Sequence, residues 1–562
     1  MQLKLLKIIF CFSFILYHST AYSKATVSNN FNQKYLSNYF SGLLSYDNQQ
    51  NELALKFFES SKPLIKKHNS YLRRYIFSLV NDGQVQKAIK QNNYWKNKKN
   101  SNFFESKLLS VIDSMAKKNF EKSQNLIEEL KFYDSDDAFE VIIYEILNGY
   151  NSLFLNKKIK KSERNLGNLS LITSAFQNCY LNSDSTDSYF VNLINSDSGD
   201  YSRYLYFYLN NIVEKKDYSY AKEISSTIES LSSSLLISQT KAWIDSSDFS
   251  KFEKYFSCKN ENDILSEFFF LISNLYSSDD YFEKSNFYLN ISNYLNSKFY
   301  FNLSLLAENY YLVDNFKKVK EILKNFNEED QIYFWYKNKK LAQIIGEQKD
   351  DKRALKFIEK EFKKYKKPPK KIIYDMANIY KRSKKYEKAI NYYTKVISKL
   401  DKKSKEYADT LYKRGGAYER IKDHKNSDKD LLLSLEINPN EPYVLNYLAY
   451  SWLERNYKIE EAIDMLHIAY NQRKNDPYII DSVGWGYFLT GDYINAEKYI
   501  RQAIKLMPDD PIVNDHYGDI LWKLNRKIQA RYFWESAYNL EDSDKELKKN
   551  IKKKLIKGME KI

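Results

Sequence analysis

The sequence predicts an all-α protein, an α-solenoid of stacked helical hairpins. Two ladders of small residues recur in its last third, Gly415, Ala449, Gly484 and Gly518, and Ala389, Ser427, Ala462, Ala496 and Ala530. Their steps of 34 to 38 residues are typical of a repeat made from one pair of helices. Helix-breaking residues are also scarce, because the chain has 8 prolines and none of them lies between Pro63 and Pro368.

The unit that begins at Pro477 indicates why each repeat folds as two helices. Its small and apolar residues fall three or four positions apart, at Ile480, Val483, Gly484 and Tyr487, and again at Ala496, Ile500 and Ala503. This is the spacing of one helix face, so each half predicts a helix with one buried side. Gly491 and Asp492 supply the turn, and Pro508 ends the unit. A glycine or alanine where the helices cross lets their backbones approach closely.

These residues resemble the tetratricopeptide repeat, in which a small residue and a tyrosine on the first helix precede Ala-x3-Phe-x2-Ala and a proline. Five units between 370 and 542 carry the pattern, at Ala377, Tyr380, Ala389 and Tyr393, at Gly415, Tyr418 and Pro439, at Leu448, Ala449, Trp452, Ala462 and Ala469, at Gly484, Tyr487 and Ala496, and at Gly518, Ala530, Trp534 and Ala537. The last unit departs from it, with Leu521 in place of the tyrosine. The resemblance implies a right-handed superhelix whose concave side binds proteins.

The N-terminal part of the chain divides less clearly. Lys4 and Lys7 precede an apolar run at 8–17 and then small residues, which predicts a signal peptide over 1–23. An uncleaved anchor is the alternative. Divergent repeats are predicted over 26–130 and 216–369, where small or apolar residues keep the period at Gly42, Ala54, Ala88, Ser123, Ser285, Val319 and Ala354.

Between these parts, residues 131–215 are predicted to be a divergent helical segment. The polar stretch at 181–200 interrupts it, either as a hinge or as a long loop, and the loop is preferred. The lysine-rich residues 543–562 predict a helix that caps the last repeat with Leu547, Ile551, Leu555 and Met559 along one side. The alternative role for this basic helix is peripheral contact with an anionic membrane.

The net charge bears on which partners the protein binds, and the cysteine count bears on whether it contains a disulfide. The net charge of +16 suits nucleic acid or an anionic surface, but lysine and glutamate alternate along most helices, which favours a solvated surface and no nucleic-acid binding. Without the predicted signal peptide two cysteines remain, Cys179 and Cys258. An exported compartment permits one bridge between them, although two unrelated buried thiols are the preferred expectation.

The sequence offers little for catalysis. It has no phosphate-binding glycine loop, no paired-histidine zinc motif, no nucleophile elbow and no C-x-x-C. We therefore expect no catalytic residue, no cofactor and no metal. His516, between Asp515 and Asp519, suggests a metal ligand, but one imidazole favours an ordinary surface or groove histidine.

The resemblance also implies where partners bind, because in the family the first helix of each repeat lines the concave wall. Carried onto this chain, those positions are Tyr374, Asn378, Lys381, Tyr412, Asn446, Tyr450, Asp481, Trp485, Asp515, Asp519 and Trp522. About half of the aromatic side chains among them, two tryptophans and three tyrosines, are expected to be exposed. Rigid aromatic side chains on such a wall are suited to binding an extended peptide or a helix.

We therefore predict a periplasmic scaffold or adaptor that binds protein or peptide ligands. The last third of the chain is similar to exported repeat proteins of AT-rich alphaproteobacteria, which implies a role in cell-envelope assembly. Two alternatives stay open. One is an accessory factor or enzyme of polysaccharide or peptidoglycan metabolism with a catalytic module at about 130–215, and the other is an array that binds nucleic acid.

Overall fold

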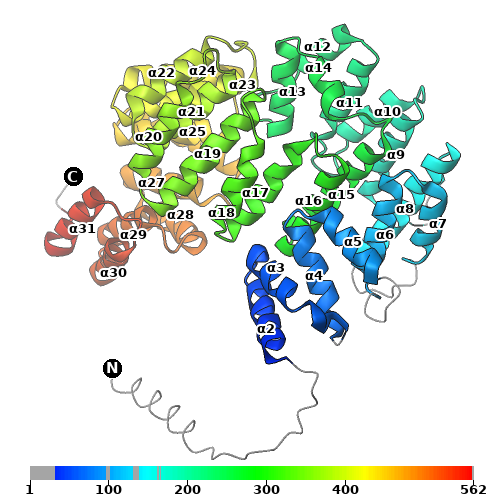
Figure 1. Ribbon diagram of the computed structural model, residues 1–562. Coiled ribbons are helices and arrows are strands. Elements are labelled where there is room, and N and C mark those ends of the chain that lie inside the picture. Colours follow the sequence, from blue (N-terminus) through cyan, green and yellow to red (C-terminus); the bar gives the residue numbers. More distant parts are fainter. Residues whose placement is uncertain are drawn as a thin grey trace, which may run out of the picture. The chain divides into compact units, whose positions relative to one another are not determined.

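The computed structural model describes residues 32–66, 68–95, 102–130, 138–160, 164 and 166–559. Within these ranges all regular secondary structure is helical, which confirms the predicted all-α fold (Figure 1). No helix in the described part of the chain is both long and apolar enough to cross a bilayer. The predicted signal peptide at 1–23 lies outside the described residues.

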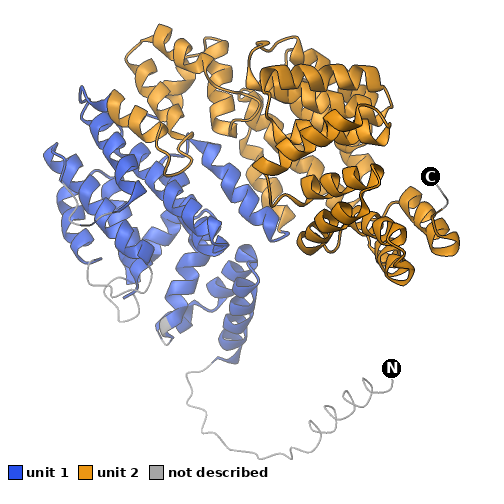
Figure 2. Cartoon of the chain, turned by 180° about the vertical axis from the view of Figure 1, so that it is seen from behind, with its two compact units in different colours: residues 1–186, 256–314 blue, residues 187–255, 315–562 orange. Residues whose placement is uncertain are grey.

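The chain folds into two compact units (Figure 2). Unit 1 comprises residues 1–186 and 256–314. Its α-helices are α2 (Gln33–Asp47), α3 (Asn51–Ser60), α4 (Asn69–Asn81), α5 (Val85–Trp95), α6 (Phe104–Ala116), α7 (Phe120–Glu128), α8 (Ala138–Asn156), α9 (Asn168–Tyr180), α15 (Glu261–Ser278), α16 (Phe282–Leu295) and α17 (Leu303–Leu312).

Unit 2 comprises residues 187–255 and 315–562. Its N-terminal segment holds α10 (Thr186–Ile194), which starts at the boundary, α11 (Tyr204–Glu214), α12 (Tyr218–Ser226), α13 (Leu235–Asp245) and α14 (Ser250–Tyr255). Its second segment holds α18 (Phe316–Ile322), α19 (Gln331–Gln348), α20 (Asp351–Phe362), α21 (Lys370–Arg382), α22 (Tyr386–Ile397), α23 (Lys405–Arg420), α24 (His424–Ile437), α25 (Pro442–Glu454), α26 (Ile459–Gln472), α27 (Pro477–Leu489), α28 (Tyr493–Leu506), α29 (Pro511–Lys523), α30 (Lys527–Asn539) and α31 (Lys545–Lys557).

Consecutive helices of unit 2 pair as hairpins from α19–α20 to α29–α30, and each hairpin packs on the next. Capping residues mark where these helices begin, and turn residues reverse the chain between them. The carboxylate of Asp476 accepts hydrogen bonds from the backbone N–H groups of Tyr478 and Ile479, at 3.0 and 3.3 Å, and Pro477 takes the first helical position of α27. Gly491 then reverses the chain with a φ of +86°. The stack confirms the predicted α-solenoid.

The predicted ladders mark the points where paired helices cross. A Cβ placed on Gly484 would lie 2.7 Å from Cγ1 of Ile500 on the partner helix, and one on Gly415 would lie 3.0 Å from Cγ of Leu431. Gly518 faces the indole of Trp534 in the same way. The second ladder is fully buried, at Ala389, Ser427, Ala462, Ala496 and Ala530. The expected close approach of the helix backbones is confirmed.

Unit 1 uses the same device with an aromatic core. Gly42 of α2 faces the ring of Phe58 in α3, beside the buried Ala54, and Tyr39 stacks on Tyr71 at 5.0 Å between ring centres. Four other positions predicted to continue the period fall on the second helix of a packed pair, namely Ala88 on α5, Ser123 on α7, Ser285 on α16 and, in unit 2, Ala354 on α20, while Val319 lies on α18 of unit 2.

The preference for a long loop at 181–200 is wrong, because α10 forms inside this stretch. Phe190 and Leu193 lie three residues apart and are fully buried, so one side of a short helix packs inward. Thr186 begins the helix, and its hydroxyl donates to the carbonyl oxygens of Asn178 and Ser183. The many serines and aspartates of this stretch favoured a loop and gave too little weight to two apolar residues that are buried.

The preference for unrelated thiols is also wrong, because Cys179 and Cys258 form a disulfide with their Cα atoms 5.9 Å apart. Both belong to unit 1, Cys179 at the end of α9 and Cys258 just before α15. The chain leaves unit 1 after residue 186 and re-enters it at 256. The bridge therefore joins the two ends of this excursion.

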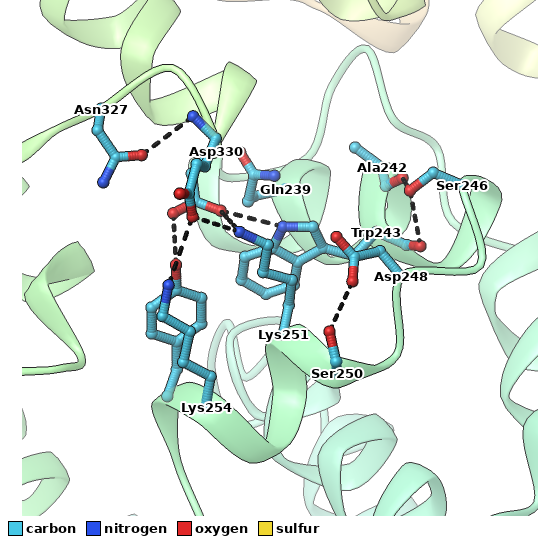
Figure 3. A network of polar contacts seen from close by, with 12 residues as sticks. Gln239, Ala242, Trp243, Ser246, Asp248, Ser250, Lys251, Lys254, Asn327 and Asp330 are labelled. Carbon is cyan, nitrogen blue, oxygen red and sulfur yellow. Dashed lines mark hydrogen bonds and ion pairs between the residues drawn. The ribbon is translucent and has the colours of Figure 1, made fainter.

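A buried carboxylate ties the N-terminal segment of unit 2 to its second segment (Figure 3). Asp330 precedes α19 and is fully buried. It accepts hydrogen bonds from Nε1 of Trp243 at 3.1 Å and from the hydroxyl of Tyr255 at 2.7 Å. Gln239 of α13 accepts a further hydrogen bond from the backbone N–H of Ile332 at 2.9 Å. These contacts position α19 within unit 2.

Substituting Gly484→Ala is expected to destabilise the α27–α28 hairpin by about 1–3 kcal/mol, because the new methyl group overlaps Ile500. Faster amide hydrogen exchange across these two helices would measure it. Gly346→Ala is the matched control, since the nearest atom to its Cβ is 3.4 Å away and alanine favours a helix. Equal effects of both substitutions would contradict the crossing-point interpretation.

Replacing both Cys179 and Cys258 with serine is expected to lower the free energy of unfolding. The bridge closes a loop with a sequence separation of 79 residues, which corresponds to about 4–5 kcal/mol from chain entropy. Thermal unfolding of oxidised and reduced wild-type chain should show the same loss. A serine variant as stable as the oxidised protein would contradict this estimate.

Candidate protein-binding groove

The first helices of successive hairpins in unit 2 lie side by side and form a continuous surface, which we call the first-helix wall. It consists of the helices α19, α21, α23, α25, α27 and α29, and contacts join α19 to α21 and link α23, α25, α27 and α29 in order. All eleven predicted groove positions fall on five of these helices, from Tyr374 on α21 to Trp522 on α29.

The wall is less exposed than expected. None of the eleven side chains is fully exposed. Three are buried, namely Asp481, Asp515 and Asp519, and the others are partly buried, namely Tyr374, Asn378, Lys381, Tyr412, Asn446, Tyr450, Trp485 and Trp522. The expectation that about half of the aromatic side chains would be exposed is wrong, because the positions carried over from the family give the helix face but not what packs over it.

The acidic end of the wall is covered by the C-terminal helix. Lys554 of α31 places its Nζ 2.8 Å from Oδ2 of Asp515 and 2.7 Å from Oδ2 of Asp519. Trp534 donates from Nε1 to the other oxygen of Asp519 at 2.8 Å. Burial raises the pKa of Asp519, and the ammonium of Lys554 opposes that rise. These two aspartates therefore hold α31 in place.

The apolar side of α31 completes this covering. Ile551 is buried in the cluster that contains Trp534, and Leu547, Leu555 and Met559 pack against it, as the predicted stripe requires. Gly558 lies directly on the ring of Trp522. Lys552, Lys553 and Lys557 remain exposed on the opposite side of the helix. Contact of these lysines with a membrane stays a prediction.

His516 is buried and pairs with Asp481 instead of the aspartates beside it in the sequence. Its Nδ1 lies 2.9 Å from Oδ1 of Asp481, and Trp485 stacks on the imidazole at 4.0 Å between ring centres. Burial lowers the pKa of His516, but Asp481, with Asp515 and Asp519, outweighs burial and the pKa is raised. The expected surface or groove histidine is in fact a buried partner of a groove residue.

Aromatic side chains occupy the middle of the wall. Tyr412 meets Tyr447 edge-on at 5.9 Å, and the hydroxyl of Tyr447 donates to Glu419 at 3.1 Å. Burial raises the pKa of Tyr450. Trp485 is partly exposed and donates from Nε1 to Glu454 at 2.7 Å, so its ring has a fixed orientation. This part of the wall offers rigid rings to a partner.

The other end of the wall is hollowed. A depression of about 360 Å³ is lined by Lys339, Asp375, Asn378, Lys381, Arg382 and Lys413. Two of these residues, Asn378 and Lys381, are among the predicted groove positions. The other four are not, although Lys413 directly follows the predicted Tyr412, because the charge on a single helix does not tell which of its faces a neighbouring helix leaves open.

The described part of the segment at about 130–215, proposed as a hidden catalytic module, forms the helices α8, α9, α10 and α11 with turns and irregular residues between them. Among the described residues no group of three or more histidine, cysteine, aspartate or glutamate side chains is placed to hold a metal ion.

Comparison with known proteins gives the same picture for the last third of the chain. A family model described as tetratricopeptide repeat matches residues 371–398, 408–441 and 483–510. These segments correspond to α21–α22, α23–α24 and most of α27–α28, three of the five predicted units. A TPR repeat-containing protein of Pseudomonas aeruginosa is 32% identical over 109 residues, which cover 19% of this chain and 18% of that relative.

Two solved structures are similar in fold. A tetratricopeptide repeat protein of Parabacteroides merdae is 18% identical, and the match covers 45% of this chain and 97% of that one with a TM-score of 0.38. A thermophilic TPR protein of Thermus thermophilus is 16% identical and covers 34% of this chain and 100% of its own, with a TM-score of 0.30. The family-model matches alone identify tetratricopeptide repeats in this chain, at residues 371–398, 408–441 and 483–510.

Proposed function

We propose that this protein is a scaffold that binds partner proteins on its first-helix wall. The observation that carries this proposal is the run of partly exposed aromatic side chains on successive first helices, Tyr412 on α23, Tyr450 on α25 and Trp485 on α27. Two of these rings, those of Tyr412 and Trp485, are held by ring or hydrogen-bond contacts to neighbouring residues. Rings fixed by neighbouring contacts lose little entropy when a partner binds, so they contribute more of their contact energy to affinity.

We further propose that the scaffold works in the periplasm, in cell-envelope assembly. The basic and apolar N-terminal residues support export. The disulfide between Cys179 and Cys258 is independent support, because such bridges persist in oxidising compartments and are rare in the cytosol. The role in the envelope rests on the resemblance to exported repeat proteins.

Photo-crosslinking tests the wall as a binding surface. A photoreactive phenylalanine analogue at Trp485 is expected to yield crosslinked partner proteins in cells, because this side chain is partly exposed on the wall. The matched control is Tyr532 on α30, which is 67% exposed but lies on a second helix. Tyr412→Ala should weaken crosslinking at Trp485. The same adducts at Tyr532, or none at Trp485, would contradict the proposed surface.

Fractionation tests the proposed location. Release of the outer membrane is expected to free the protein or expose it to added protease, while a cytosolic marker stays protected. Cys179 and Cys258 should resist alkylation until a reductant is added, because they are bridged in an oxidising compartment. A protein that stays with the cytosolic marker and carries free thiols would refute export.

A further inference from the structure

The hollow at the basic end of the first-helix wall gathers charges of one sign. Lys339 comes from α19, Lys381 and Arg382 from α21, and Lys413 from α23, so four cations surround a single carboxylate, that of Asp375. They come from three successive first helices. The positive charges therefore come from separate helices and meet in one hollow.

The carboxylate in this hollow is already engaged. Oδ2 of Asp375 accepts from Nζ of Lys339 at 2.6 Å and from Nε1 of Trp335 at 3.0 Å. This pair fixes α19 to α21. In the described part of the chain, no ion pair joins Lys381, Arg382 or Lys413 to an acidic group. Burial raises the pKa of Asp409 on the same helix as Lys413, and the charge of Lys413 opposes that rise.

Among these three residues, Lys381 gives the strongest indication of a binding site. Its Nζ reaches the backbone of α23, where a Cβ placed on Gly416 would lie 3.4 Å from it. Burial, together with Lys413 and Arg420, lowers the pKa of Lys381 to about 8. Holding an ammonium group here without a carboxylate reduces folding stability. An anion from another molecule that pairs with this ammonium group would offset that loss of stability.

We propose that this hollow binds acidic side chains of a partner protein, with two or more carboxylates of one segment meeting Lys381, Arg382 and Lys413. The inference rests on the proposed function, because it assigns the class of segment that the first-helix wall accepts. A segment that lies along the wall would place its carboxylates in the hollow and its apolar side chains on the rings of Tyr412 and Tyr450.

The geometry favours several carboxylates over one phosphate group. Helix N-termini bind phosphate through clustered backbone N–H groups. Here Lys339 and Lys413 lie inside their helices and Lys381 and Arg382 lie in the last turn of α21, so the donors are side chains alone. Cations spread over three helices match charges spread along a peptide.

The test measures fluorescence anisotropy of a short labelled peptide of alternating glutamate and serine with an amidated C-terminus, mixed with the full chain. The double variant Lys381→Gln, Lys413→Gln is expected to bind at least about tenfold more weakly, because it removes two charged hydrogen-bond donors to the carboxylates of the peptide. A glutamine–serine peptide should not bind. Loss of wild-type binding in high salt should accompany the effect.

The matched control removes the same charge elsewhere. A second hollow on the second helix α28 is lined by Ile494, Glu497, Lys498, Arg501, Gln502 and Lys505. Lys498→Gln with Lys505→Gln is expected to leave peptide binding unchanged. Equal weakening by both double variants would assign binding to the overall charge of +16 and overturn the proposal.

Further results also decide the question. A peptide that binds only with a free C-terminal carboxylate, or one displaced equally well by inorganic phosphate, would overturn the assignment to acidic side chains.

Thermal unfolding separates a role in binding from a role in folding. Lys381→Gln removes a charge that has no ion-pair partner among the described residues, so the midpoint temperature of unfolding should stay unchanged or rise. A lowered midpoint would indicate a structural role and contradict the proposal. Crosslinking that persists at Trp485 without peptide binding would refute this inference and leave the scaffold function standing.

Discussion

The close approach of two helices at one small residue is the contact on which the rest of the structure depends. At Gly484 and Gly518 a methyl group has no room, because Ile500 and Trp534 of the partner helices already fill the space. A hairpin closed in this way still exposes apolar side chains, so each pair needs its neighbour. Since every hairpin of the C-terminal stack crosses at the same place, its first helices all fall on one side and form a single wall.

This constraint is local, which explains how much of the fold could be predicted. A small residue repeated at a nearly constant step, with apolar neighbours three and four positions away, specifies a hairpin without knowledge of the rest of the chain. The same ladder located second helices as far upstream as Ala88 and Ser123. Contacts between residues far apart in the sequence produce no repeating pattern in it, so they could not be predicted in this way. The disulfide between Cys179 and Cys258 and the pairing of Lys554 with two aspartates are of this kind.

The groove shows the same limit at the level of single side chains. Periodicity and the family pattern placed all eleven predicted positions on first helices, but burial depends on the next element in space. Asp515 and Asp519 were assigned to an open wall, and the final helix covers them through Lys554. Phe190 and Leu193 within α10 are the opposite case, because they are fully buried on one side of a helix inside a stretch whose composition favours a loop.

The charges at the two ends of the wall support different roles for those ends. At the acidic end each buried charge has a partner, Lys554 between Asp515 and Asp519, and His516 against Asp481. That is how a protein stabilises charge inside a permanent interface, where an unpaired ion is costly. At the basic end Lys339 is paired with Asp375, and among the described residues no carboxylate forms an ion pair with Lys381, whose pKa is lowered. Folding alone gives no reason to keep that arrangement, because an apolar side chain of similar length would fill the same space without desolvating a charge. The acidic end therefore resembles a closed internal contact, and the basic end resembles half of a contact whose other half belongs to a different molecule.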